Sequence, residues 1–219
     1  MASLSVPQAA ERLGVNERRV RQLIELNRLP AQKVGKRWVV ESEDIDEMRD
    51  SERLAGRPYS SRNAWALLVL AAGREPTWLS NPERSRLRGI LESQGIAMLL
   101  PRLSRRSEVF EWYVHPSLLE RLSADARTVV GGAGAVDALI DESVVELYIA
   151  SSARQEMESE FFVDSGAARP NVVVRSIDGP WPFDPGQKTA DRIVAAADLL
   201  ERVPDSRRAR VAEELLKDA

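Results

Sequence analysis

The chain has 219 residues, with 31 Lys and Arg against 34 Asp and Glu, so its formal net charge is −3. This length predicts one or two domains. There is no cysteine, which excludes a disulfide framework, a thiolate zinc site and a thiol nucleophile. No apolar run approaches the roughly 18 residues of a membrane span, and the N-terminus lacks the apolar segment of a signal peptide. We therefore expect a cytoplasmic protein with no membrane partner.

The charge is distributed unevenly along the chain. Residues 1–40 hold eight basic and three acidic side chains, a net charge of +5, whereas residues 41–50 hold six acids and one arginine, a net charge of −5. An acidic total argues at first against a nucleic-acid partner, but the local distribution decides what a surface presents. The basic charge is concentrated near the N-terminus.

The first residues predict two short helices across a tight turn. Ser5 caps the first helix, and Gln8 three residues later completes a capping box. Gly14 ends this helix, because glycine readily adopts the left-handed conformation found after helices. Val15 is expected to be a buried residue of the turn, and Asn16 to cap the second helix.

The second helix has an apolar and a basic side. At about 100° per residue, its apolar residues gather on one side, and these are Val20, Leu23 and Ile24. In the major groove Arg pairs with both acceptors of guanine and Gln pairs with adenine, whereas flanking arginines neutralise phosphates. We therefore assign Arg18 and Gln22 to base edges, and Arg19 and Arg21 to the DNA backbone. The cap residue Asn16 is included in the predicted DNA-binding set.

Residues 29–40 predict a hairpin, because two short β-prone runs are separated by a glycine-containing turn. Trp38 is expected to pack this hairpin onto the helices. Ser42 then caps a third helix over residues 43–48, whose acids point away from DNA. The hairpin is interpreted as a basic wing along the DNA backbone, with contacts from Lys33, Lys36 and Arg37.

The stretch SVPQAAERLGVNERRVRQLIELNRLPAQKVGKRWVVESEDIDEM resembles the winged helix-turn-helix of the excisionase and MerR-like DNA-binding families. The helix spacing, the turn glycine, the GKRW segment and the capping serine occur together and in order. The resemblance implies a DNA-binding domain over residues 1–50. The alternative is a solvated, arginine-rich helix in a domain that binds something else, because charged outer faces are usual on surface helices.

Residues 51–60 are polar, contain Gly and Pro, and predict a linker to a second domain over residues 61–219. A helical subdomain is expected over residues 61–107, with an apolar helix that ends near Gly73. A second basic cluster follows, for which three interpretations stay open: a phosphate-contacting surface, an interface for an acidic protein, or a solvated face. Its members are Arg84, Arg86, Arg88, Arg102, Arg105 and Arg106.

From residue 108 onward the pattern alternates between short strands and helices, which predicts an α+β subdomain over residues 108–219. Strands are expected at 108–114, 129–130, 144–149 and 171–175. The final segments, 189–202 and 206–217, are expected to form a helical hairpin packed on the sheet. The predicted fold is thus mainly α with an α+β second domain.

The second domain carries a further resemblance, in the order of the segments RNAWALL, WLSNPERSRLRGIL, WYVHPSLLERL, NVVVRS, WPF and AADLLERVPDSRRARVAEELL. This order is similar to that in actinobacterial regulators grouped with the AbiEi-type antitoxins. The family implies a protein that binds its own promoter and accompanies a nucleotidyltransferase-type toxin. The excisionase-like N-terminal domain of this chain departs from the commoner members of the AbiEi-type group.

No group of residues in the sequence indicates an active site. His115 is the only histidine and is expected to be a helix cap or a surface residue. The glycine run at 131–134 lacks the ending of a phosphate loop and the dinucleotide fingerprint spacing, so it is interpreted as a turn. Acid pairs at helical spacing are interpreted as solvated faces, and they are Asp137/Asp141, Glu156/Glu160 and Asp198/Glu201. We expect no catalytic residue, metal or cofactor.

Three functional hypotheses follow. The first is an autoregulatory, antitoxin-like transcriptional regulator that binds double-stranded operator DNA and a cognate toxin. The second is an excisionase-like architectural protein that directs recombination. The third is a DNA-targeted enzyme whose active site is not apparent in the sequence. A single winged module usually needs a second copy for specific affinity, so a homodimer on an inverted repeat is expected.

Overall fold

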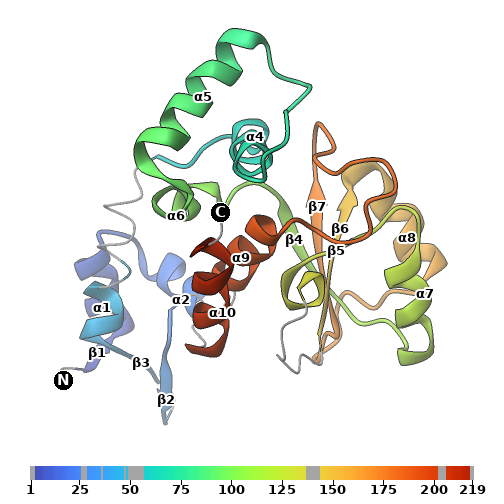
Figure 1. Cartoon of the computed structure of the whole chain (residues 1–219). Helices are drawn as coiled ribbons and strands as arrows, with labels where there is room; N and C mark the ends of the chain where they lie inside the picture. Colours follow the sequence, from blue (N-terminus) through green and yellow to red (C-terminus); the bar gives the residue numbers. More distant parts are fainter. Residues whose placement is uncertain are drawn as a thin grey trace. The chain divides into compact units, whose positions relative to one another are not determined.

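The computed structural model describes residues 3–25, 29–35, 37–46, 48, 57–136, 144–201 and 206–217 (Figure 1). The described residues up to Arg57 form one compact unit, and those from Pro58 onward form a second. Most of the predicted linker, residues 51–56, lies outside the described residues, as does the acid pair Asp137/Asp141.

The N-terminal unit contains two helices and a small sheet, and residues 42–46 are also helical. The sheet has the order β1-β3-β2 and is antiparallel throughout. Two helices followed by a hairpin were expected, whereas the first strand was not. The elements are β1 (Ser3–Ser5), α1 (Val6–Leu13), α2 (Glu17–Glu25), β2 (Gln32–Val34) and β3 (Arg37–Glu41).

The turn between α1 and α2 follows from local chemistry. The side-chain oxygen of Gln8 accepts from the Ser5 N–H at 2.9 Å, and Gly14 ends α1 with φ +70°. The expectation that Val15 is buried is wrong, because 36% of this residue is exposed. The core of the unit is instead filled from the helices and β3, with Trp38 packed against it as expected.

The C-terminal unit begins with three helices. Ser80 precedes the longest of them, and its N–H donates to a Glu83 carboxylate oxygen at 2.9 Å, which caps the helix. The helices are α4 (Ser61–Ala71), α5 (Asn81–Gln94) and α6 (Ile96–Leu99), and a 3-10 turn η1 (Leu100–Leu103) follows.

A four-stranded sheet of order β4-β7-β6-β5 forms the centre of this unit. β6 and β7 are parallel, and each outer strand is antiparallel to its neighbour. The predicted strands are therefore present, and the strand expected at 171–175 extends two residues further. The strands are β4 (Glu108–Trp112), β5 (Val129–Val130), β6 (Val145–Ala150) and β7 (Val172–Ile177).

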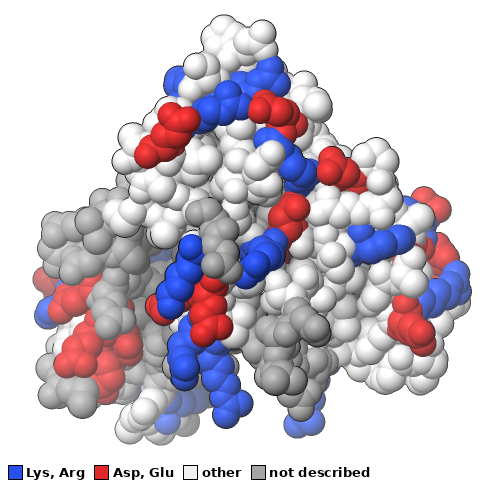
Figure 2. All heavy atoms as spheres, viewed as in Figure 1, with Lys and Arg blue, Asp and Glu red and all other residues white. Residues whose placement is uncertain are grey.

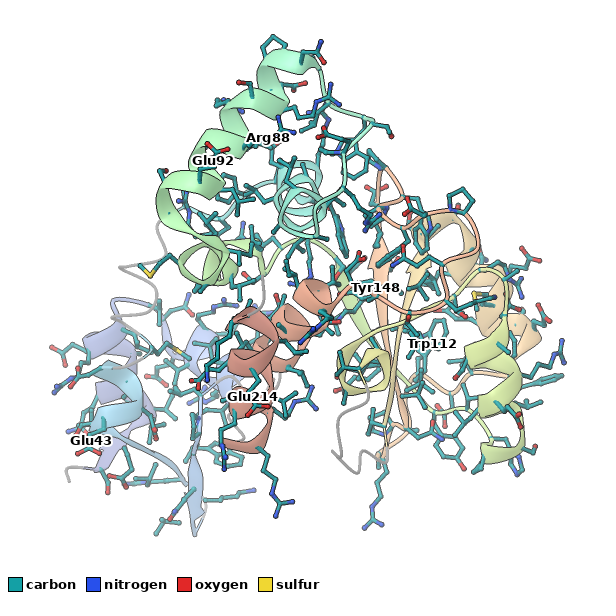
Figure 3. All side chains as sticks on the ribbon, in the orientation of Figure 1. Glu43, Arg88, Glu92, Trp112, Tyr148 and Glu214 are labelled. Carbon is teal, nitrogen blue, oxygen red and sulfur yellow. The ribbon has the colours of Figure 1, made fainter. Side chains whose placement is uncertain are left out.

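Each face of the sheet has its own core. Trp112 belongs to the core on the side of α7 and α8, and Tyr148 to the core that includes α4 and α9 (Figure 3). α9 and α10 contact each other through small and apolar residues, which confirms a terminal helix pair. The remaining elements are η2 (Pro116–Leu118), α7 (Leu119–Ala124), η3 (Gly132–Ala135), η4 (Ser151–Ala153), α8 (Arg154–Glu160), α9 (Arg192–Glu201) and α10 (Ser206–Lys217).

The observed architecture agrees with the expected fold class of an N-terminal helical module with a small sheet, followed by a mixed helix and strand region. In the described part of the chain, no helix combines the length and the apolar character needed to cross a membrane.

Candidate nucleic-acid interface

α2 buries one side and exposes the other. Val20, Leu23 and Ile24 belong to the core of the N-terminal unit, whereas Arg18, Arg21 and Gln22 are exposed and Arg19 is half-buried. The helical period therefore separates an anchoring side from a side that is rich in hydrogen-bond donors.

The polar side chains of α2 make few contacts with the protein. Asn16 accepts the Arg19 N–H at 2.8 Å and so caps the helix. Arg21 pairs with Glu17 at 2.9 Å, and Arg18 makes no ion pair or hydrogen bond with any residue that the structure describes. Exposed pairs of this kind contribute about 0–1 kcal/mol, so a guanidinium group can readily exchange its carboxylate partner for another anion.

The β2–β3 hairpin presents a second set of basic side chains. Lys33 and Arg37 are exposed, and the Lys33 ammonium lies 5.7 Å from the centroid of the Trp38 ring. Val34, paired with Arg37 across the hairpin, is 63% exposed. Lys36, the third predicted wing residue, lies outside the described residues.

The acidic segment after the hairpin pairs with a different arginine. Arg12 on α1 forms a two-pronged contact with the Asp46 carboxylate. The hydrogen bond and the charge of Asp46 raise the pKa of Arg12. This basic residue is therefore engaged within the module and was not among the predicted DNA contacts.

The second basic cluster does not form one uniform surface. Arg84 and Arg88 both pair with Glu75, at 3.4 and 2.6 Å. Arg102 lies over the Tyr59 ring, with its guanidinium carbon 4.3 Å from the centroid. Figure 2 shows Lys and Arg interspersed with Asp and Glu over α5. Arg86 and Arg105 are exposed and have no partner among the described residues.

For Arg106 the prediction of a surface position is wrong. Its side chain is fully buried, and its backbone carbonyl accepts from the Trp65 indole at 2.8 Å and from the Ser61 hydroxyl at 2.6 Å. The guanidinium donates to Asp198 Oδ1 at 2.6 Å and to Glu201. It is paired inside the unit because burial of an isolated charge would be strongly unfavourable.

Arg106 belongs to a network of six charged side chains between the sheet and the terminal helices. Arg175 on β7 donates to Glu201 at 2.7 Å and lies 3.2 Å from Asp198. Arg208 on α10 donates to Glu146 on β6 at 2.9 Å. Among the described residues the network contains three positive and three negative side chains, and these are Arg106, Glu146, Arg175, Asp198, Glu201 and Arg208.

The network corrects the interpretation of Asp198 and Glu201 as a solvated acid pair, because Asp198 is fully buried. Tyr148 also donates to Asp198, and burial raises the pKa of this phenol, which keeps it protonated. Burial alone would lower the pKa of Arg106, but the carboxylates of Glu201 and Asp198 raise it well above its ordinary value. The carboxylates of the network thus favour the cationic forms of Arg106 and Arg175, whereas burial lowers the pKa of Arg208.

The glycine run after β5 lies against this network. The Gly132 N–H donates to Asp198 Oδ2 at 2.9 Å. A Cβ at Gly131 would lie 2.8 Å from the Tyr148 ring, and one at Gly132 would lie 2.6 Å from the Glu146 side chain. The run is therefore a close backbone approach within the core, as well as the turn that the sequence predicts.

His115 serves as a local cap. The Ser117 N–H donates to His115 Nδ1 at 3.3 Å, and the ring is exposed at the start of η2. This confirms the expected capping role. Among the described residues, no group of three His, Asp or Glu side chains could hold a metal ion.

Residues 3–53 match the family of helix-turn-helix domains. Comparisons with curated proteins and with solved structures returned no match to the chain. The family match covers the N-terminal unit and supports DNA binding by it.

Proposed function

We propose that the chain is a sequence-specific, DNA-binding transcriptional regulator, in which α2 enters the major groove. The observation that carries the proposal is the exposed position of Arg18 and Gln22 on the side of α2 opposite its buried residues. Arginine and glutamine are the side chains that pair bidentately with guanine and adenine there. The helix-turn-helix match supports the same docking mode.

Arg19, Arg21, Lys33 and Arg37 are assigned to phosphates in this proposal. Exposed cations beside a recognition helix contribute affinity for any DNA sequence and make it depend on salt. Asn16 contributes as the cap that holds the start of α2, and Lys36 continues the basic hairpin in sequence.

We further propose that the C-terminal unit binds a protein partner and performs no catalysis. The resemblance to AbiEi-type regulators supports autoregulation together with a nucleotidyltransferase-type toxin. Dimerisation on an inverted repeat would give two recognition helices the affinity that one helix lacks. The second candidate is an excisionase-like architectural role, which the resemblance of the N-terminal module supports.

The test is a titration of the full-length protein against a labelled fragment of its own upstream region and against scrambled DNA, at physiological salt. Sequence-dependent binding with Kd of about 10⁻⁸ M or tighter is expected. Equal, weak binding to both fragments would contradict the proposal. A circular-permutation bending assay on the bound fragment separates a regulator from an architectural protein, for which a large bend is expected.

A further inference from the structure

Arg19 and Gln22 are joined on the exposed side of α2. The Arg19 Nη1 group donates to Gln22 Oε1 at 2.9 Å, across the i, i+3 spacing that places two side chains on one face. The Arg19 backbone N–H is held by the Asn16 side chain at 2.8 Å, and Arg19 is half-buried while Gln22 is exposed. The contact therefore joins the half-buried Arg19, whose backbone is held by Asn16, to the exposed side chain of Gln22.

The bond selects one of the two orientations of the glutamine amide. A carboxamide has an accepting oxygen end and a donating nitrogen end of nearly equal shape, and an isolated surface glutamine can present either of them. A guanidinium has donors only, so Arg19 binds the oxygen end. Gln22 then keeps both Nε2 protons and one oxygen lone pair for a ligand.

Those remaining groups match one base edge. Adenine in the major groove offers an acceptor at N7 and a donor at N6, which one amide oriented in this way satisfies together. A reversed amide would place its oxygen opposite N7, where two acceptors would face each other. An unrestrained amide can also pair singly with guanine, thymine or cytosine, so its orientation determines how strictly the base is read.

We infer that Arg19 is a positioning residue for base recognition, which holds the Gln22 amide in the orientation that reads adenine. The inference rests on the proposed function and changes one assignment within it, because Arg19 then contributes to specificity beyond its charge. Arg21, which pairs with Glu17 on the same helix and does not hold a base-reading side chain, is the matched comparison.

The experiment uses the full-length protein and its operator. The base pair read by Gln22 is located first, as the operator position at which Gln22→Ala no longer distinguishes between the four base pairs. Kd values are then measured for the four base pairs at that position with wild type, Arg19→Ala, Arg21→Ala and Arg19→Ala/Gln22→Ala. We expect Arg19→Ala to lower the preference for adenine roughly 5-fold, and Arg21→Ala to weaken binding to all four DNAs equally. In the Gln22→Ala background, Arg19→Ala should leave the preference unchanged.

Two results overturn the inference in distinguishable ways. If wild type discriminates the operator but Arg19→Ala behaves like Arg21→Ala, the proposed function stands and Arg19 is only a phosphate contact. If wild type binds operator and scrambled DNA equally, the proposed function fails and the inference fails with it. Circular dichroism of each variant checks that the helix content is unchanged.

Discussion

The arginines of the two units illustrate opposite uses of one side chain. On α2, Arg18 and Arg21 are exposed and Arg19 is half-buried, and each of these side chains has at most one partner among the described residues. In the C-terminal unit Arg106 and Arg175 are buried, and each contacts both Asp198 and Glu201. The difference is desolvation. An exposed pair contributes about 0–1 kcal/mol, whereas removing one partner of a buried pair costs roughly 3–5 kcal/mol. The exposed arginines are thus available to a ligand, and the buried ones determine the packing.

The largest expected effect is the loss of a buried partner. Arg175→Ala should lower the free energy of unfolding by roughly 3–5 kcal/mol, because Asp198 and Glu201 would be left with an unbalanced charge. Urea denaturation of the full-length protein measures this. Arg105→Ala, at an exposed position, should change stability by no more than about 0.5 kcal/mol. If the two substitutions lower the free energy of unfolding equally, burial does not determine how much an arginine contributes to stability.

The glycine run tests how tightly the network is packed. Gly132→Ala should destabilise by about 2–3 kcal/mol, because φ is +55° and the new Cβ would lie 2.6 Å from the Glu146 side chain. The control is Gly89→Ala within α5, where the added Cβ would lie in open space beside its own helix and about 0.4–1 kcal/mol of stabilisation is expected. Thermal unfolding of both variants measures the two effects. An unchanged melting temperature for Gly132→Ala would show that the Glu146 side chain can move to make room for the added methyl group.

The exposed arginines of the N-terminal unit are tested by measurements of DNA binding instead of protein stability. Arg18→Ala should reduce discrimination between operator and random DNA by about 1–3 kcal/mol, because it would remove the base contact that we propose for Arg18. Arg37→Ala should weaken binding to operator and to random DNA by a similar factor. It should also reduce the slope of log K against log salt concentration by about one unit. Fluorescence titrations at several salt concentrations distinguish the two, and a uniform loss for Arg18→Ala would contradict its assignment to a base edge.

The smallest expected effect concerns Glu83, a half-buried carboxylate that belongs neither to the DNA-facing side chains nor to the buried network. Hydrogen bonds from Arg62 and Ser80 lower the pKa of Glu83 to about 2 from an ordinary value of 4.5. A lowered pKa in the folded state means that the stabilisation is present above pH 4.5 and is lost as the pH falls toward 2. Glu83→Gln should therefore flatten the decline of stability in this window, as followed by urea midpoints from pH 5 to 2. If stability falls with pH in the same way in wild type and Glu83→Gln, the ionised Glu83 carboxylate does not contribute to stability.

The N-terminal module was predictable from the sequence because its signals are local. Ser5, Gln8 and Gly14 define one helix within ten residues, and Asn16 starts the next. β1 was missed, since three residues carry little periodicity and its pairing depends on β3, which is more than thirty residues away.

The buried network was missed because its members are distant in sequence. Arg106 follows Arg102 and Arg105 and so was grouped with them, while its partner Asp198 is 92 residues away. One signal was nonetheless available. Glu146, Arg175 and Asp198 each interrupt an apolar run, and a charge in such a run indicates a buried, paired side chain.

The separation between Arg106 and Asp198 also has a consequence for the order of events during synthesis. At about 5–20 residues per second, the carboxylate that pairs with Arg106 is made on the order of 5–20 s after it, whereas the core of the helix-turn-helix module is built from residues 4–48 alone. The DNA-binding module can therefore finish folding while the central sheet still lacks its counter-charges. A nascent chain in this interval would carry a complete helix-turn-helix module before the buried charges of its C-terminal unit are paired.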